Sequence, residues 1–219
     1  MSTAMNSFSS KVAIITGGGS GIGKEVAIRL VKAGASVVIG GRDETKLKRA
    51  AAEIDPIGAN VRISAVDIAS PSTAKSLVDV TTQTFGGVDI LINNAGVFLP
   101  KPFIDLSESE YDWFLDTILK GKFFMAQAAA KAMKLRGGGS IVQTGSLWAL
   151  QAIGATPSSA YSAANAGVHA LTRNLAIELA QSGNKAKAKR YFECLMKIAG
   201  QSTARPELAQ ARAFLAANP

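Results

Sequence analysis

The sequence has little of several features that mark other classes of protein. Cys194 is the only cysteine among 219 residues, so neither a disulfide nor a cysteine-based zinc site can form within one chain. No apolar run approaches the roughly 20 residues that a membrane-spanning helix needs. Residues 1–10 lack the apolar stretch of a secretory signal. We therefore expect a cytoplasmic protein that does not bind membranes.

Charged and aromatic residues are sparse as well. They make up 18% and 6% of the chain, whereas hydrophobic residues make up 47%. This composition excludes global disorder and is sufficient for one sizeable core. The net charge of +8 is concentrated in residues 184–219, which hold seven basic and two acidic residues. We interpret this segment as a solvated tail, with polyanion binding as the alternative, and expect no nucleic-acid partner.

Apolar, β-branched runs alternate with helical periodicity along residues 11–181. The expected strands are Lys11–Thr16, Ser36–Gly40, Val61–Val66, Val88–Ile92 and Ser140–Thr144. The expected helices are residues 23–33, Glu44–Ile54, Pro71–Phe85, Ser107–Leu135 and Ser158–Gln181. This order predicts an α/β fold of the Rossmann-like type, in which helices cover both faces of a doubly wound parallel sheet of about five strands.

The alternation stops after Gly183. Residues 184–219 contain no strand-like run and indicate two helices, over 186–199 and 206–217. We therefore expect a dinucleotide-binding domain over 1–183 and a basic helical segment over 184–219, packed on the same domain. Without a further strand, Ser140–Thr144 is expected to form a sheet edge, which the C-terminal helices would cover.

A glycine-rich turn separates the first strand from the first helix. It runs Thr16-Gly17-Gly18-Gly19-Ser20-Gly21-Ile22-Gly23. Such a turn lets backbone amides approach a diphosphate at a helix N-terminus, where the positive end of the helix dipole favours negative charge. The alternative is a tight turn that needs glycine only for its backbone angles. Its place after the first strand of an α/β chain favours nucleotide binding.

The turn is one of four motifs that together resemble the classical short-chain dehydrogenases/reductases. The others are Asn93-Asn94-Ala95-Gly96, a serine after the fifth strand, and Tyr161-Ser-Ala-Ala on the last helix. The resemblance covers about residues 9–183. It implies NAD(P)(H)-dependent hydride transfer between nicotinamide and a small carbonyl or alcohol substrate. By analogy with the long helices of that family, it also implies a homo-oligomer.

The cofactor residues follow from the turn and from the resemblance. The expected contacts are Gly17, Gly19, Ser20, Gly21, Ile22, Gly23, Arg42, Asp67, Ile68, Asn93, Ala95, Gly96 and Tyr161. The second strand ends in glycine where an NAD-binding unit has an acidic residue, and Arg42 follows, which favours NADP(H) over NAD(H). One alternative is that Arg42 is only a solvated loop residue, and Asp43 could also pair with it. Another is that Asp67 serves only to start a helix.

The resemblance assigns Ser146 to hold the substrate oxygen and Tyr161 to exchange its proton. The expected partner of the tyrosine, four residues on, is lysine in the family but Asn165 here, and Ile118 replaces an asparagine. An isolated tyrosine has a pKa of about 10, and a nearby cation lowers it. Lys120, Lys122 and Lys131 are possible substitute cations. His169 is a structural residue or a substitute acid–base.

These substitutions leave three interpretations. The first is an oxidoreductase, of full or impaired activity, with catalytic residues Ser146, Tyr161 and Asn165, and we expect no metal. The second is a dinucleotide-binding or scaffold protein without catalysis. The third is an interaction protein that binds a partner through its basic tail. Compared with the family, the C-terminus is also atypical and shortened, so the sequence does not identify the substrate.

Overall fold

The computed structural model describes residues 7–152, 154–181 and 216. The chain divides into two compact units, residues 1–169 and 170–219, with the boundary inside helix α6 (Ser159–Gln181). The sheet belongs to the first unit, to which the rest of this description applies. The expected boundary at residue 183 and the helix over 186–199 lie outside the described residues, and the helix over 206–217 overlaps them only at Ala216.

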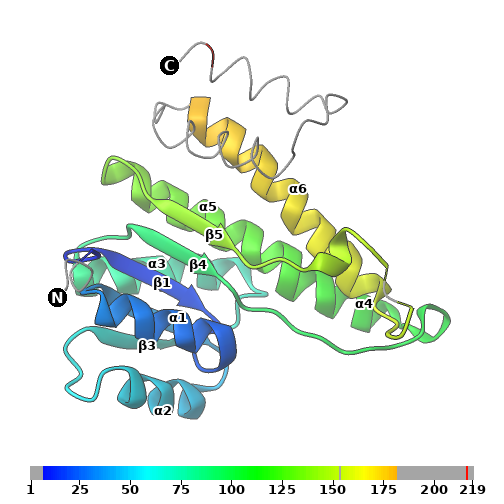
Figure 1. Cartoon of the computed structure of the whole chain (residues 1–219), viewed down its shortest axis with the longest axis horizontal. Coiled ribbons are helices and arrows are strands. Elements are labelled where there is room, and N and C mark those ends of the chain that lie inside the picture. The colour runs from blue at the N-terminus through cyan, green and yellow to red at the C-terminus, as the bar shows by residue number, and fades with distance from the viewer. Residues whose placement is uncertain (1–6, 153, 182–215, 217–219) are drawn as a thin grey trace. The chain divides into compact units, whose positions relative to one another are not determined.

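Five strands form one parallel sheet (Figure 1), as the sequence predicts. They are β1 (Val12–Thr16), β2 (Ser36–Gly41), β3 (Val61–Ala65), β4 (Ile90–Asn93) and β5 (Ser140–Gln143), in the order β3-β2-β1-β4-β5. Thr16 of β1 is in register with Gly40 on one side and Asn93 on the other. The carboxyl ends of the central strands therefore bring the glycine-rich turn and the Asn93 segment together.

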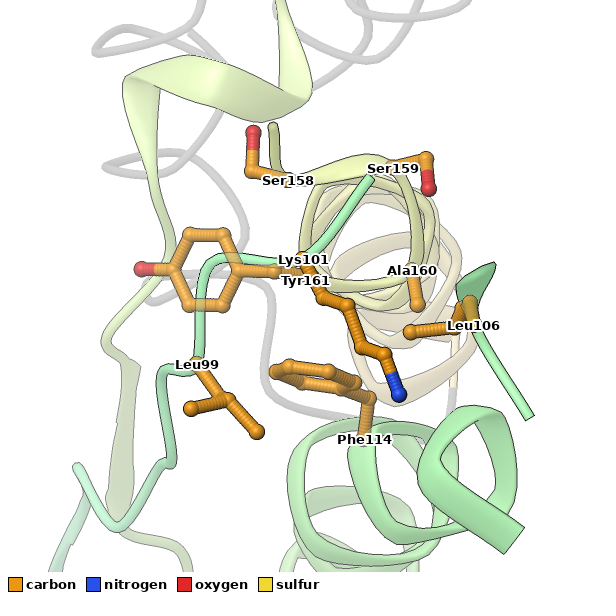
Figure 2. A pocket seen from close by; sticks show the side chains of 8 residues that line it. All are labelled: Leu99, Lys101, Leu106, Phe114, Ser158, Ser159, Ala160 and Tyr161. Atoms are coloured by element: carbon orange, nitrogen blue, oxygen red, sulfur yellow. The ribbon is translucent and has the colours of Figure 1, made fainter. Parts of the chain in front are cut away.

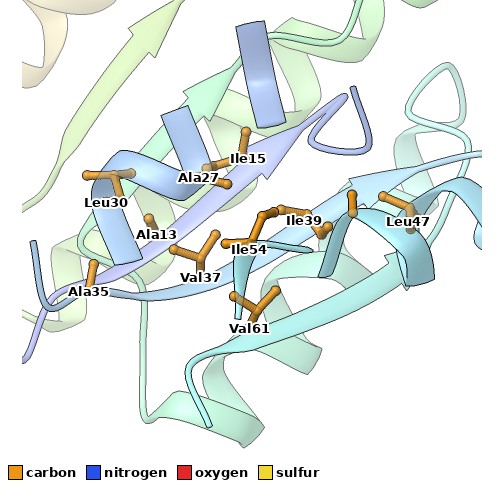
Figure 3. Close-up of a cluster of buried hydrophobic side chains, with 11 residues drawn as sticks. Ala13, Ile15, Ala27, Leu30, Ala35, Val37, Ile39, Leu47, Ile54 and Val61 are labelled. Atoms are coloured by element: carbon orange, nitrogen blue, oxygen red, sulfur yellow. The ribbon is translucent and has the colours of Figure 1, made fainter. Parts of the chain in front are cut away.

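Helices cover both faces of this sheet. Helices α1 (Gly21–Lys32) and α2 (Glu44–Ile54) pack on β1, β2 and β3, while α3 (Pro71–Phe85) and α5 (Gly121–Leu135) pack together on the opposite face. Figure 3 shows the core beneath α1 and α2, where apolar side chains of the strands meet those of the helices. Strand β1 is buried along its whole length because it lies between two strands and two helical layers.

The expected helix over 107–135 is one helical run with a change of winding. It comprises α4 (Glu108–Phe114), the π-helical segment η2 (Leu115–Lys120) and α5. Ser107 and Glu110 close a capping box at its start. The side chain of Ile118, inside η2, packs against Ala160, Ala164 and Val168 of α6. The sequence predicted one continuous helix here, and its apolar periodicity did not indicate the π-helical turn.

Strand β5 is the last strand of the sheet among the described residues, as expected. The side chain of Val142 is 51% exposed there. The side-chain amide of Gln143 is buried without a hydrogen-bond partner in the described part of the chain. Two short 3₁₀ helices, η1 (Phe103–Asp105) and η3 (Leu147–Ala149), lie in the connections that follow β4 and β5.

Candidate dinucleotide and catalytic site

The turn after β1 is held close to the start of α1. Gly17 has a φ of +68°, in the left-handed region that favours glycine, and its amide donates to the Gly40 carbonyl oxygen at 2.8 Å. A Cβ on Gly23 would overlap the carbonyl oxygen of Gly17. These two glycines therefore allow the helix to begin directly against the turn.

The first amides of α1 are available to a ligand. No group in residues 7–152 or 154–181 accepts a hydrogen bond from the backbone N–H of Ser20, Gly21 or Ile22. The side chain of Ser20 makes no cap, and the side chain of Ile22 is 68% exposed. Unpaired amides at a helix N-terminus, together with the helix dipole, attract an anion. The turn can thus hold a diphosphate in the way the sequence predicts.

A buried polar network joins this turn to the segment after β4. The Thr16 hydroxyl accepts from the amides of Asn94 and Ala95 at 2.9 and 3.0 Å, and donates to the side-chain oxygen of Asn93 at 3.3 Å. Asn93 is fully buried, and its amide donates to the Lys122 carbonyl at 2.8 Å. Ala95 therefore lies beside the turn, because its Cα is 3.0 Å from the place that a Cβ on Gly17 would take, and Gly96 is exposed.

The residues expected at the adenosine end follow β2 and β3. Arg42 is exposed and has no hydrogen bond or ion pair within the described residues. Asp43 does not pair with it but caps α2, because its carboxylate accepts from the Lys46 amide at 2.8 Å. Asp67 is exposed, and its carboxylate accepts from the Ala69 amide at 3.0 Å, while Ile68 is buried. The N-cap of α3 is Ser70, so Asp67 is not the capping residue.

Tyr161 stands on α6 among other aromatic rings. Its ring centroid lies 5.0 Å from Phe98, 5.8 Å from Trp148 and 6.5 Å from Phe114, each contact edge-to-face. In Figure 2 its hydroxyl points away from Phe114 and Lys101, out of the small crevice that they line. Ser146 is the N-cap of η3, and its hydroxyl oxygen accepts from the Trp148 amide at 3.2 Å.

The two substituted positions are both buried. The side chain of Asn165 is 3% exposed and donates to the Tyr161 carbonyl oxygen at 2.9 Å, within its own helix. The side chain of Ile118 is 1% exposed and packs in the apolar cluster that includes Phe114 and Val168. Neither side chain carries charge, so any cation of the site must come from elsewhere in the chain.

Lys122 is the one buried cation among the described residues, and it contacts the segment that follows β5. Its side chain is 2% exposed, and its ammonium donates to the carbonyl oxygen of Thr144, two residues before Ser146. Burial lowers its pKa from 10.5 to about 8. Lys120 is exposed and paired with Asp116, and Lys131 bonds the side chain of Gln127. Of the three lysines suggested by the sequence, only Lys122 is buried, and its ammonium contacts the segment between β5 and Ser146.

Two other ionisable side chains lie near the expected catalytic residues Tyr161 and Ser146. Lys101 pairs with Glu110 at 2.7 Å, and this hydrogen bond, followed by those from Ser107, lowers the pKa of Glu110 to about 2. His169 packs its imidazole against Gly145, where a Cβ would overlap the ring. The charge of Lys101 is thus already balanced, and His169 lies beside the residue that precedes Ser146.

Sequence reasoning missed the aromatic residues around Tyr161. Phe98 and Trp148 come from different connections, and their rings lie 5.2 Å apart in an edge-to-face contact. The sequence could have pointed to them, because each aromatic residue closely follows a motif residue. Phe98 lies two residues after Gly96, and Trp148 lies two residues after Ser146. Aromatic residues so close to a catalytic motif at the carboxyl ends of strands are candidates for substrate contact.

Comparison with known proteins agrees with the fold. The family model described as short chain dehydrogenase matches residues 11–188. The chain is 39% identical over 173 residues to the (2S)-[(R)-hydroxy(phenyl)methyl]succinyl-CoA dehydrogenase subunit BbsD of Thauera aromatica, covering 79% of this chain and 68% of that protein.

Two solved structures extend the comparison. A short-chain type dehydrogenase/reductase from Mycobacterium marinum has a TM-score of 0.78 and 35% identity, covering 83% of this chain and 74% of that one. A short chain dehydrogenase from Burkholderia cenocepacia in complex with NADP has a TM-score of 0.75 and 32% identity, covering 81% and 72%. In the described residues, no helix is long and apolar enough to cross a membrane, and no group of histidine, cysteine and acidic residues could hold a metal ion.

Proposed function

Because the chain belongs to the short-chain dehydrogenase/reductase family and is an NAD(P)-dependent oxidoreductase, we propose that it uses NADP(H) in preference to NAD(H) to interconvert a small carbonyl compound and its alcohol. The nicotinamide supplies or accepts the hydride. Tyr161 gives or takes the proton on the substrate oxygen, and Ser146 holds that oxygen. The observation that carries this proposal is the set of unpaired amides of Ser20, Gly21 and Ile22 at the head of α1.

The preference for NADP(H) is supported by the surroundings of Arg42. Strand β2 ends in Gly40 and Gly41, so no carboxylate stands at its end to bind a ribose hydroxyl. Asp43 is engaged in capping α2, which leaves the Arg42 guanidinium for the 2′-phosphate. The complex of the Burkholderia cenocepacia protein with NADP is in keeping with this choice. A homo-oligomer and a cytoplasmic location are further parts of the proposal and rest on the sequence.

Replacing Arg42 with alanine is expected to weaken NADPH binding about 10-fold or more, because a hydrogen bond to a charged group contributes about 1.5–3 kcal/mol. NADH affinity should change less than about twofold, since NADH has no 2′-phosphate. Titration calorimetry with both cofactors measures this. Arg49→Ala, an exposed arginine on α2, is the matched control. Equal losses for both cofactors would remove Arg42 from the proposal, and no binding of either by the natural chain would overturn the dinucleotide site.

The alternative is a dinucleotide-binding protein without catalysis. It is supported by Asn165, because this buried amide brings no charge to Tyr161. Asn165→Lys places an ammonium one helical turn from Tyr161 and is expected to raise the rate of carbonyl reduction about 10-fold or more, since a nearby cation lowers a tyrosine pKa by a unit or more. The rate is followed by NADPH oxidation. Asn165→Met, uncharged and of similar length, should give no gain. A rate that stays near zero in Asn165→Lys while NADPH still binds would favour a cofactor-binding protein without catalysis.

A further inference from the structure

Three rings from three separate segments meet at the catalytic tyrosine. Phe98 follows β4, Trp148 lies in η3 after β5, and Tyr161 lies on α6. Each ring touches the other two, with centroids 5.0, 5.2 and 5.8 Å apart and interplanar angles of 70–78°. The carbon skeleton of a substrate whose oxygen reaches the Tyr161 hydroxyl must therefore pass close to Phe98 and Trp148.

The two segments that carry these rings also expose apolar side chains. Phe98 and Leu99 are each 46% exposed, while Leu147 and Leu150, which flank Trp148, are 60% and 70% exposed. Single exposed apolar residues are common on protein surfaces, but a group of them beside a reactive residue marks a binding surface. The contact between Phe98 and Trp148 joins the two segments into one apolar wall.

Trp148 also lines a hollow of about 470 Å³. This volume lies within the roughly 300–1,000 Å³ typical of small-molecule sites. Its lining includes the apolar Trp148, Leu150 and Pro157, and the neutral hydrogen-bonding side chains of Gln151, Ser158 and Ser162. None of the described lining residues is charged, so these walls suit a neutral group that carries hydroxyl, ether or carbonyl substituents.

We propose that the substrate is an uncharged aromatic alcohol or ketone whose ring sits on the carbon that reacts. The ring packs against Phe98 and Trp148, and its substituents extend into the hollow. This inference rests on the proposed function at one point, the role of Tyr161 in proton exchange. In the oxidation direction, the hydride leaves the carbinol carbon for NADP⁺, the hydroxyl proton passes to the ionised oxygen of Tyr161, and the ketone forms. An aromatic ring is favoured over an aliphatic one of equal size because edge-to-face contacts add to the gain from burial.

The first test compares 1-phenylethanol, 1-cyclohexylethanol and 2-propanol as substrates with NADP⁺. We expect kcat/KM to fall in that order, with 1-phenylethanol about 10-fold or more above 2-propanol. Phe98→Ala and Trp148→Ala should each remove most of this preference. Phe123→Ala is the matched control, because Phe123 is 42% exposed and makes a similar ring contact, 5.3 Å to Phe124, on α5. Phe98→Leu replaces Trp148→Ala if the latter does not fold.

The second test does not need turnover. The chain has two tryptophans, so Trp113→Phe leaves Trp148 as the only one, and Trp148→Phe leaves Trp113. With NADPH present in place of NADP⁺, so that the alcohol cannot be oxidised, 1-phenylethanol should quench Trp148 fluorescence saturably and leave Trp113 fluorescence unchanged. Saturable quenching without oxidation would support the aromatic site and overturn the proposed function. Oxidation of all three alcohols at similar kcat/KM without quenching would overturn the aromatic site alone, and neither signal would overturn both.

Discussion

Replacing Tyr161 with phenylalanine is expected to lower kcat for carbonyl reduction by a factor of about 10² to 10⁴, the range of general acid–base catalysis. The phenylalanine ring keeps the edge contacts with Phe98, Trp148 and Phe114 at 5.0–6.5 Å, so only the hydroxyl is lost. NADPH affinity should change by less than about threefold, because Tyr161 is only one of the expected cofactor contacts and the diphosphate contacts are on the turn before α1. Steady-state rates and calorimetric titration with NADPH measure the two effects separately.

The Tyr161 comparison is made in the natural chain and in the Asn165→Lys background, so that a low natural rate does not hide the loss. Tyr111→Phe is the control, since Tyr111 is 47% exposed on α4 and has no part in the proposed site. It should leave both rate and affinity unchanged. If Tyr161→Phe retained at least half of the rate in both backgrounds, another group would have to exchange the proton.

The sheet could be predicted from the sequence because each strand is an apolar run bounded by strong turn signals. Helices α2 and α3 were placed to the residue, since Asp43 and Ser70 precede them and Asp55 and Gly86 follow them. The π-helical turn of η2 was not predicted, because the apolar periodicity over residues 107–135 was used only to place a helix and not to define its winding. Ile118 of η2 packs against residues of α6, which are distant in sequence.

The cofactor end of the site was more predictable than the substrate end. The roles of Gly17 and Gly23 in the turn could be predicted, because close approach of the backbone restricts those positions to glycine. Phe98 and Trp148 carry no such local constraint, and only the fold brings them to Tyr161. Likewise, the sequence named Lys122 as a cation but could not place it, because its burial depends on where α5 meets β5.

Replacing Lys122 with methionine is expected to raise the free energy of unfolding at pH 7 by about 1–2 kcal/mol. Burial lowers the pKa of Lys122 from 10.5 to about 8, so the folded state holds its proton less firmly than the unfolded state. At about 1.4 kcal/mol per pKa unit, keeping this ammonium buried at neutral pH costs up to about 3 kcal/mol. Methionine fills a similar volume without charge but leaves the Thr144 carbonyl without its donor, which offsets about 1 kcal/mol or more.

The dependence of this difference on pH identifies its origin. Below about pH 8 the lysine is charged in both states, and the full penalty is present. Between pH 8 and 10.5 the unfolded chain binds more protons than the folded chain, so the natural protein gains stability relative to the variant as pH rises. Above about pH 10.5 only the lost hydrogen bond remains, and the variant should be the less stable protein. Urea unfolding of both proteins across this range measures the crossover. If the difference in unfolding free energy did not depend on pH, Lys122 would not be held charged in a buried site. A crossover together with loss of oxidoreductase activity in the variant would indicate that the chain retains this costly charge for the chemistry beside Ser146.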